Sequence, residues 1–402
     1  MNLPAILGGR PVAAGRSWGP PWPVHSTRER QLLAEVLSAP TWGATGMGPK
    51  IAQLNRSWAA YCGTARSVAL ANGTVTMELA LRAYGVGPGE EVVVPAWTFA
   101  ATAIAVSRVG AIPVFVDIDP DTLCIDPAAL AAVIGPRTRA VIPVHFGGHP
   151  ADMHAILDLA REHQLKVIED AAQAHGAILT GRLVGSFGDA GSFSFQQSKN
   201  LQCGEGGSLV TDDEELADRL HFSLSKFGRG LRERYQPFTH HELAGNECMT
   251  EFQAAVLLAQ LERLDDQLGA RERSANYLRK ELTGTAELQP LPVEASVDRH
   301  GNHLFLLRLR DGSPALLQRV VEALQAEGVP AFSLYPRPLF EEPIWAAGGA
   351  HARVVTDCPE TYRASREIVA LPQTLLLGNR EDCDLVIEAF IKVARYLDVL
   401  AK

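Results

Sequence analysis

Four short segments of the chain carry side chains that can do chemistry, and three of them follow a run of apolar residues. The first is Asn72-Gly73-Thr74, where backbone N–H groups and a hydroxyl at the start of a helix suit a phosphate. The second holds Asp170, and the third carries Ser194 and then Lys199 in a polar, glycine-flanked loop. The fourth is Pro95-Ala96-Trp97-Thr98-Phe99, whose rings could stack on a flat ligand.

Each of these features also has an ordinary structural explanation. An Asn-Gly turn with Thr74 as the helix N-cap is at least as common as a phosphate site, and Asp170 could equally cap a helix. A lone lysine is usually a solvated surface group, and aromatic side chains most often pack in a core. Taken singly, none of the four segments identifies a ligand.

The combination of the four segments, in this order, predicts a site for pyridoxal 5′-phosphate. This cofactor needs a cup of N–H groups for its phosphate, a stacking ring, a carboxylate beside its pyridine nitrogen and a lysine for its aldehyde. A lysine that is shielded from water near a cationic cofactor loses its proton more readily and becomes a nucleophile. Lys199 and Asp170 are therefore the expected catalytic pair.

The four segments lie at the ends of strands in a predicted α/β fold. Over the first two-thirds of the chain, short β-rich runs alternate with helical patterns, which indicates crossover units and a mostly parallel sheet. Open sheets of this kind bind ligands at the carboxyl ends of their strands. The expected strands are 67–71, 91–94, 114–117, 140–144, 166–169, 192–194 and 208–211, and the expected helices are 74–84, 98–109, 127–134 and 152–163.

The pattern changes after about residue 250. A long helix is expected over 251–282, followed by a strand at 303–309, a helix at 314–327, a proline-rich loop at 330–343 and a closing helix at 380–400. We interpret this as an N-terminal arm (1–40), a large domain that binds the cofactor (41–260) and a smaller C-terminal α/β domain (261–402).

Composition excludes several classes of protein. The 402 residues are 47% hydrophobic and carry a net charge of −9, so neither disorder nor binding to nucleic acid or an anionic membrane is expected. The six cysteines are not spaced as a metal site, and we predict no metal. The stretch 92–106 is too short to span a bilayer and 1–15 does not resemble a signal peptide, so a cytoplasmic protein is the expectation.

Longer motifs resemble a known family. The run EDAAQAHGA…GSFSFQQSKNLQCGEGG, with PAWTFAAT before it and GNECMTEFQAAV after it, is similar to the DegT/DnrJ/EryC1/StrS aminotransferases. These are pyridoxal-phosphate enzymes of fold type I that act on keto-sugars and keto-cyclitols. The resemblance covers the chain from about Gly8 onward. It implies a large domain with a mostly parallel seven-stranded sheet and a smaller C-terminal α/β domain.

The resemblance also implies a role for individual residues. It implies Lys199 as the Schiff-base lysine and Asp170 as the partner of the pyridine nitrogen. Gly73, Thr74 and Ser194 would bind the phosphate, and Phe99, rather than Trp97, would stack on the ring. Gln173 would lie beside the phenolic oxygen or the phosphate, and Asn246 would reach across a dimer interface to the partner's phosphate. Active sites built in this way imply a homodimer.

The resemblance further implies a reaction, with alternatives. Some members carry His in place of the lysine and dehydrate or deoxygenate their substrates, so Lys199 favours amino transfer. The segments 8–12 and 195–199 are closer to the branch that uses L-glutamine with scyllo-inosose or 2-deoxy-scyllo-inosose in aminoglycoside pathways. We expect an aminotransferase that moves an amino group from L-glutamine (or L-glutamate) to a keto-cyclitol or keto-sugar. An aromatising lyase similar to 3-amino-5-hydroxybenzoate synthase and a nucleotide-sugar aminotransferase are the alternatives.

Substrate contacts are less well defined by the sequence. The donor carboxylate needs a cationic or backbone partner and a polyol needs hydrogen-bonding groups. The segment after Asn246 lacks the Arg that is usual in the family, which puts its substrate contacts in question. Each remaining candidate also has an ordinary surface or core role; the candidates are His145, Arg229, Arg232, Arg234, His303 and Tyr335.

Overall fold

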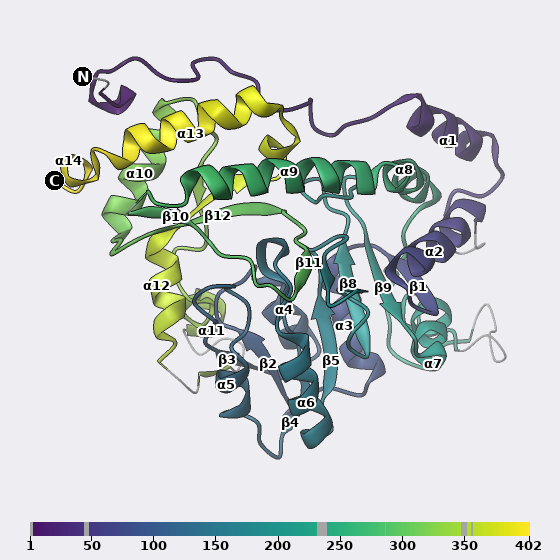
Figure 1. Cartoon of the computed structure of the whole chain (residues 1–402). Helices are drawn as coiled ribbons and strands as arrows, with labels where there is room; N and C mark the ends of the chain where they lie inside the picture. Colours follow the sequence, from purple (N-terminus) through teal and green to yellow (C-terminus); the bar gives the residue numbers. More distant parts are fainter. Residues whose placement is uncertain (1–2, 44–47, 231–238, 286, 347–351, 355–356) are drawn as a thin grey trace.

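The structure is a computed structural model that describes residues 3–43, 48–230, 239–285, 287–346, 352–354 and 357–402. Its main sheet has eight strands in the order β1-β9-β8-β5-β4-β2-β3-β14 (Figure 1). All run parallel except β9, which is antiparallel to both of its neighbours. The strands are β1 (Arg66–Leu70), β2 (Glu91–Pro95), β3 (Ile112–Val116), β4 (Thr138–Val141), β5 (Lys166–Asp170), β8 (Ala190–Ser194), β9 (Gly207–Thr211) and β14 (Arg353–Val354).

The expected α/β fold is thus confirmed, with one difference in the sheet. Seven strands come from residues 66–211, as predicted, and β14 adds an eighth because it pairs with β3 at the sheet edge. Trp345 of α11 (Pro343–Ala346) is also buried against the core of this sheet. The chain beyond residue 261 therefore contributes to the main sheet as well as to the two smaller sheets.

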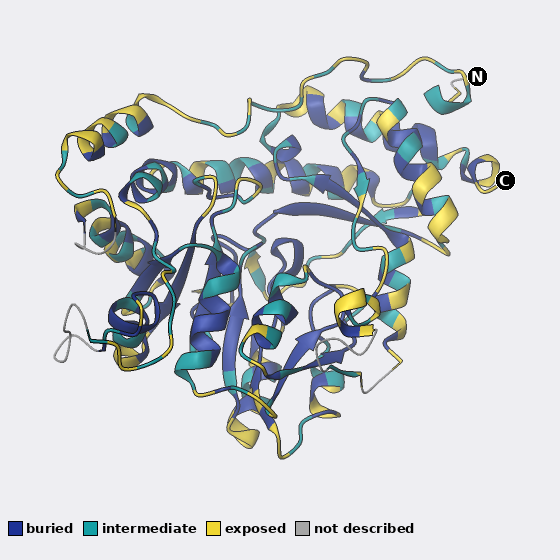
Figure 2. Cartoon of the chain, turned by 180° about the vertical axis from the view of Figure 1, so that it is seen from behind, coloured by how far each residue is buried: buried dark blue, intermediate teal, exposed yellow. Residues whose placement is uncertain are grey.

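Helices cover both faces of the main sheet, which explains why its strands are apolar throughout. Val92 and Val94 of β2 pack in one hydrophobic cluster with α3 and α4, whereas Val93 points to the other face and packs with α6. Burial runs along the strands and along the inward sides of the helices (Figure 2). The covering helices are α2 (Pro49–Cys62), α3 (Gly73–Ala83), α4 (Ala101–Arg108), α5 (Pro127–Ala131), α6 (Met153–His163) and α7 (Glu214–Asp218).

A second, antiparallel sheet lies above the first in Figure 1. Its order is β10-β12-β15-β13, and α9, α10 and α13 share a hydrophobic cluster with it. The elements of this part of the chain are α9 (Leu264–Leu282), β10 (Leu288–Pro290), β12 (Leu304–Leu309), α10 (Pro314–Ala326), β13 (Phe332–Ser333), α12 (Pro359–Glu367), β15 (Ile368–Pro372), α13 (Arg380–Ala394) and α14 (Leu397–Leu400). A small third sheet is formed by β6 (Ile178–Leu179), β7 (Arg182–Leu183) and β11 (Val297–Arg299).

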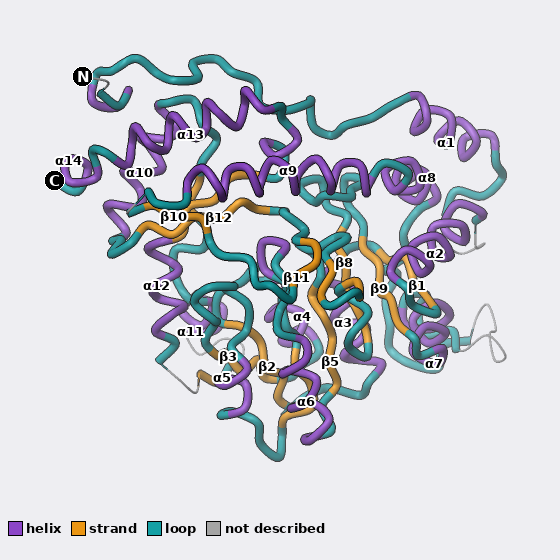
Figure 3. Tube along the Cα trace, in the orientation of Figure 1, coloured by secondary structure: helices purple, strands orange, loops and turns teal. Residues whose placement is uncertain are grey.

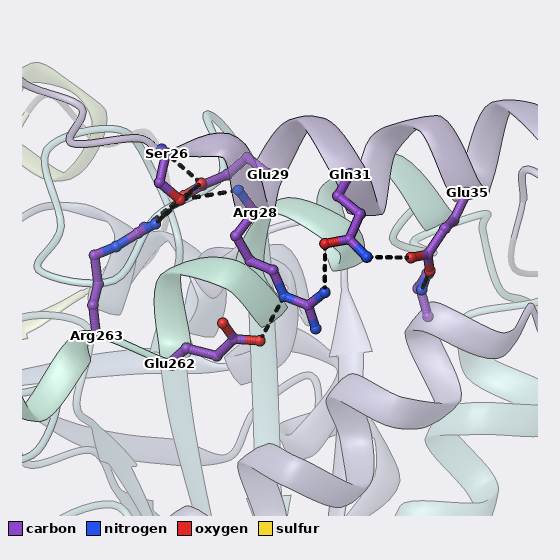
Figure 4. A network of polar contacts seen from close by, with 8 residues as sticks. Ser26, Arg28, Glu29, Gln31, Glu35, Glu262 and Arg263 are labelled. Carbon is purple, nitrogen blue, oxygen red and sulfur yellow. Dashed lines mark hydrogen bonds and ion pairs between the residues drawn. The ribbon is translucent and has the colours of Figure 1, made fainter.

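The prediction of a single long helix over 251–282 is wrong, because two helices occupy this range. The first is α8 (Glu251–Leu261), and the chain then leaves helical geometry at Arg263 (φ −113°, ψ 3°) before α9 begins. The guanidinium of Arg263 donates to both carboxylate oxygens of Glu29, at 2.5 and 3.0 Å (Figure 4). The chain therefore breaks at Arg263, whose side chain is held by Glu29, although the hydrophobic periodicity of the sequence continues across the break.

The N-terminal arm contains regular structure that the sequence analysis missed. It begins with a 3₁₀ turn (Ala5–Leu7), continues as an extended loop across the top of the molecule and ends in α1 (Thr27–Ser38), as Figure 3 shows. Ser26 and Glu29 form a capping box at the start of α1. Near the end of this loop, the indole of Trp22 donates to the carbonyl oxygen of Gln197 at 2.7 Å. The arm thus reaches the loop that carries Lys199.

Candidate active site

An open cavity with a volume of about 1350 Å³ lies at the carboxyl ends of the central strands. Because β1, β5 and β8 run in the same direction, the residues that follow them meet at this edge of the sheet. The cavity brings together seven residues predicted from the sequence to act on the cofactor: Gly73, Thr74, Phe99, Asp170, Gln173, Ser194 and Lys199.

The phosphate cup predicted from residues 72–74 has the geometry of a helix N-terminus. α3 begins at Gly73, and Asn72, not Thr74, is the N-cap, because its side-chain oxygen accepts from the N–H of Val75 at 3.0 Å. This corrects the role expected for Thr74 in the helix and leaves its side chain on the cavity wall. The first N–H groups of α3 and the hydroxyls of Thr74 and Ser194 can together hold a phosphate.

The cup is kept in shape by two close backbone approaches. A Cβ atom on Gly207 of β9 would lie 2.4 Å from the carbonyl carbon of Asn72 and 2.7 Å from the nitrogen of Gly73. A Cβ atom on Gly73 would meet the Cβ of Ser194 at 2.9 Å. Glycine at both positions therefore lets β8, β9 and the start of α3 converge.

Asp170 ends β5 with a buried carboxylate that two donors orient. The hydroxyl of Thr102 donates to Oδ2 at 2.8 Å and the N–H of Ala172 donates to Oδ1 at 3.2 Å. Residues 171–176 form turns, so the helix-cap explanation of Asp170 does not hold. Burial raises the pKa of Asp170, while these hydrogen bonds and the charge of Lys199 act in the opposite direction. A cationic ring nitrogen would add a further favourable charge.

Lys199 lies in the turn after β8, and its side chain faces the same cavity. Burial lowers the pKa of Lys199 to about 8, opposed by the negative charge of Asp170. The amine is therefore partly neutral near physiological pH, as a Schiff-base nucleophile requires. This arrangement does not match the solvated surface lysine of the ordinary explanation.

The two aromatic residues of the 95–99 segment have different surroundings. Trp97 is buried, donates to the carbonyl oxygen of Tyr335 at 3.0 Å and packs on Phe146. Phe99 lines the cavity and leaves 61% of its surface exposed. Trp97 is thus a core residue, and Phe99 is the ring available to a ligand.

Among the expected substrate residues, Tyr335 and His303 line the cavity. Gln173 lines the same cavity, and its amide oxygen accepts from the N–H of Gly147 at 2.8 Å. His303 Nδ1 lies 3.3 Å from the amide oxygen of Asn200, and burial holds the pKa of His303 well below its usual value.

His145 is not a cavity residue in this structure. It is fully buried, its Nε2 lies 2.9 Å from a carboxylate oxygen of Glu169, and its Nδ1 accepts from the N–H of Ala151 at 3.0 Å. Glu169 also accepts from the N–H groups of Gly185 and Gly188, both at 2.7 Å. The pair therefore braces the loops behind β5, and the expectation of a substrate contact at His145 is wrong for this cavity.

Arg229 and Asn246 of the expected set do not line the cavity of their own chain. The guanidinium of Arg229 lies 5.5 Å from the ring centroid of Phe227. Asn246 is exposed and forms a backbone bridge with Lys226. Arg232 and Arg234 fall within 231–238, outside the described residues.

Some cavity residues carried no signal in the sequence. Trp22 comes from the arm and Gln373 and Thr374 follow β15, so each is far from Lys199 along the chain. Thr102, the partner of Asp170, is one helical turn beyond Phe99, and only the spatial neighbourhood of β2 and β5 indicates its role.

The residues that line the cavity fit pyridoxal phosphate. The cup at α3 suits the phosphate, the exposed ring of Phe99 suits stacking, and Asp170 and Lys199 are placed for the ring nitrogen and the aldehyde. The described residues contain no group of three or more His, Cys, Asp or Glu side chains that could hold a metal ion, and no helix among them is long and apolar enough to cross a membrane.

Comparison with known proteins agrees with this geometry. The model of the DegT/DnrJ/EryC1/StrS aminotransferase family, whose members depend on pyridoxal phosphate, matches residues 25–391. An L-glutamine:scyllo-inosose aminotransferase of Streptomyces griseus is 38% identical over 98% of both chains. The crystal structure of a 3-amino-5-hydroxybenzoic acid synthase has a TM-score of 0.88 at 32% identity and covers 94% of this chain and 98% of its own.

A more distant solved structure is a putative sugar aminotransferase of Streptococcus pneumoniae in its PLP form. Its TM-score is 0.84 at 27% identity, with coverage of 95% of this chain and 99% of its own. The family match over most of the chain, the relatives and the cavity lead to the same conclusion: the chain is an enzyme that belongs to the DegT/DnrJ/EryC1/StrS aminotransferase family.

Proposed function

We propose that the enzyme uses pyridoxal phosphate to move an amino group from L-glutamine, or L-glutamate, to a keto-cyclitol. The observation that carries this proposal is that Lys199 and Asp170 line one cavity with the start of α3. The name of the Streptomyces griseus relative, an L-glutamine:scyllo-inosose aminotransferase, supports the choice of donor and acceptor.

The residues of this chain divide the work of amino transfer among them. Bound pyridoxal phosphate supplies an electron sink that makes the Cα–H of an attached amino acid acidic. Asp170, oriented by Thr102, keeps the ring nitrogen protonated. Lys199, once its amine is free and neutral, takes the proton from the donor Cα. When the ketone reacts, Lys199 gives a proton to the former carbonyl carbon of the ketone. The N-terminus of α3 and Ser194 hold the phosphate while both substrates use the same cavity in turn.

The charges on the cavity wall favour an uncharged acceptor over a nucleotide sugar. Of the described lining residues, the positively charged ones are Arg108 and Lys199, and Arg108 is paired with Glu78 at 2.5 Å. A diphosphate needs several cations or N–H donors beyond those that hold the cofactor. The remaining polar lining consists mainly of hydroxyl, amide and imidazole groups that suit a polyol; these include Gln196, Gln197, His303, Tyr335 and Thr374.

A second reaction stays open, because the similar structure of a 3-amino-5-hydroxybenzoic acid synthase has the same overall fold. An aromatising lyase would use the same Lys199 and Asp170. Its product, however, is aromatic and has lost water, whereas amino transfer to a cyclitol gives a saturated amine. The products therefore distinguish the two reactions.

We further propose that two chains form a homodimer with shared active sites. Phe99 and Leu243 expose 61% and 90% of their surfaces, and the exposed Asn246 does not line the cavity of its own chain. A partner that covers this region would bring its Asn246 to the phosphate of the first chain. No disulfide bond links the six cysteines, all of which lie in the described residues, and this supports the expected cytoplasmic location. A role in an antibiotic pathway stays a prediction.

The proposal can be tested by absorbance spectroscopy of the purified enzyme. A visible band from the bound cofactor should shift to the near ultraviolet when L-glutamine is added and return when scyllo-inosose follows. Lys199→Ala is the matched control and should show no return of the band. A wild-type band that ignores every amino acid donor would contradict the proposal.

A further inference from the structure

A fully buried arginine without an acidic partner lies behind one wall of the cavity. Arg271 of α9 has an exposed fraction of 0%. Its Nε and Nη2 both donate to the amide oxygen of Gln373, at 2.9 and 2.5 Å, and its Nη1 has no hydrogen-bond partner among the described residues. Burial lowers the pKa of Arg271 to about 9. Burying a cation that has only neutral hydrogen-bond acceptors is costly, and an anion that reaches the guanidinium would offset this cost.

The amide that covers Arg271 is part of the cavity wall. Gln373 lines the cavity, and its Nε2 lies 3.5 Å from the carbonyl oxygen of Ser198, the residue before Lys199. The ring centroid of Trp22, a second lining residue, is 5.8 Å from the guanidinium carbon. The positive charge also reaches His303 on the same wall, where it helps to hold the pKa of that imidazole below its usual value.

Amino transfer sets a problem that this arrangement can solve. The amino donor carries an α-carboxylate and the proposed ketone acceptor carries none, yet both must occupy the same cavity. A permanently exposed cation would favour the donor and leave an unpaired charge against the acceptor. A cation covered by the neutral amide of Gln373 presents a polar, uncharged wall until a carboxylate arrives.

We propose that Arg271 is the cation that binds the α-carboxylate of the amino donor, in the position that the amide oxygen of Gln373 occupies here. The inference rests on the proposed function, because it needs a donor with an α-carboxylate. The donor's carboxylate accepts from Nε and Nη2, or from Nη1, once Gln373 turns aside. Neither Arg108, paired with Glu78, nor Lys199, whose amine must react, is available for this purpose.

The test compares Arg271→Gln with a matched control, Arg279→Gln. Arg279 is a partly buried arginine of the same helix, but its guanidinium lies over Phe305 and donates to Asn302, not to a residue that lines the cavity. In Arg271→Gln, the donor concentration that half-converts the cofactor band should rise about 10- to 100-fold for L-glutamine. It should be unchanged for 4-aminobutanamide, which lacks the α-carboxylate, and the half-reaction with the ketone should keep its rate. Arg279→Gln should resemble the wild type in all three assays.

A second measurement does not depend on turnover. Calorimetry should detect binding of glutaramate, which has the carboxylate and amide of glutamine but no amino group, to the wild-type holoenzyme and not to Arg271→Gln. Gln373→Glu is a nearly isosteric variant that pairs Arg271 internally, so it should fold and also lose glutaramate binding. The inference is overturned if wild-type enzyme does not bind glutaramate, or if either variant binds it as well as the wild type does. Failure of the wild type to react with any amino acid would instead count against the proposed function.

Discussion

The reactivity of Lys199 should depend on pH in a way that its surroundings determine. Burial lowers the pKa of this amine from 10.5 to about 8. At pH 7 a group with a pKa of 8 is neutral in about 10% of molecules, whereas an ordinary lysine is neutral in about 0.03%, so the site gains roughly 300-fold in reactive amine. The neutral form is lost as pH falls, and the rate of capture of pyridoxal phosphate should fall with it.

The assay is stopped-flow absorbance of the cofactor-free protein mixed with pyridoxal phosphate from pH 6 to 9.5. The rate should rise about ninefold between pH 6 and 7 but less than twofold between pH 8 and 9. Asp170→Asn removes the charge that raises the pKa of Lys199, so its midpoint should move below that of the wild type. Lys199→Ala is the blank. A wild-type rate that still rises about tenfold between pH 8 and 9 would refute the reasoning, because it would report an ordinary amine.

Three further predictions concern the cup, the arm and the dimer. Gly207→Ala should weaken cofactor binding in a fluorescence titration, because the new Cβ atom would collide with the start of α3. The control Gly135→Ala should bind the cofactor as the wild type does, because no atom lies nearer than 4.0 Å to its new Cβ. Equal affinities of the two variants would contradict this prediction. Burial raises the pKa of Glu29, but hydrogen bonds outweigh this effect and lower the pKa to about 2. The ionised carboxylate therefore contributes about 3 kcal/mol to the free energy of unfolding above pH 4.5, and this contribution is lost as the pH falls toward 2. Urea unfolding of Glu29→Gln should show that deficit at pH 7 and a smaller one at pH 3, and a pH-independent deficit would count against the assignment. An Asn246→Ala chain mixed with a Lys199→Ala chain should recover activity in the heterodimer, and no recovery would argue against sites shared between chains.

The sequence predicts those parts of the fold and the cavity that depend on local pattern. Apolar runs that end in polar residues locate the strands, and Asp170 and Ser194 follow directly because each ends such a run. The rule that parallel strands share an edge then brings them to one place. The sequence also indicates Phe99 and Lys199, because each lies within a few residues of a predicted strand.

The remainder depends on contacts between distant segments. The strand β14 has two residues and forms because β3 offers an open edge, so no periodicity marks it. His145 looks like a substrate ligand in the sequence, but the register of β4 and β5 places it against Glu169. Arg271 and Gln373 are one hundred and two residues apart, and only the fold around the second sheet brings the guanidinium behind the part of the cavity wall that Gln373 forms.

The most direct test of the account follows the nitrogen atom. Wild-type enzyme with pyridoxal phosphate, scyllo-inosose and L-glutamine labelled with ¹⁵N at the α-amino group should yield an aminocyclitol one mass unit heavier than the unlabelled amine. Glutamine labelled at the side-chain amide should yield unlabelled product, and Lys199→Ala should yield none. A dehydrated aromatic product would contradict amino transfer to a cyclitol, and label from the side-chain amide would contradict the role given to the donor's Cα.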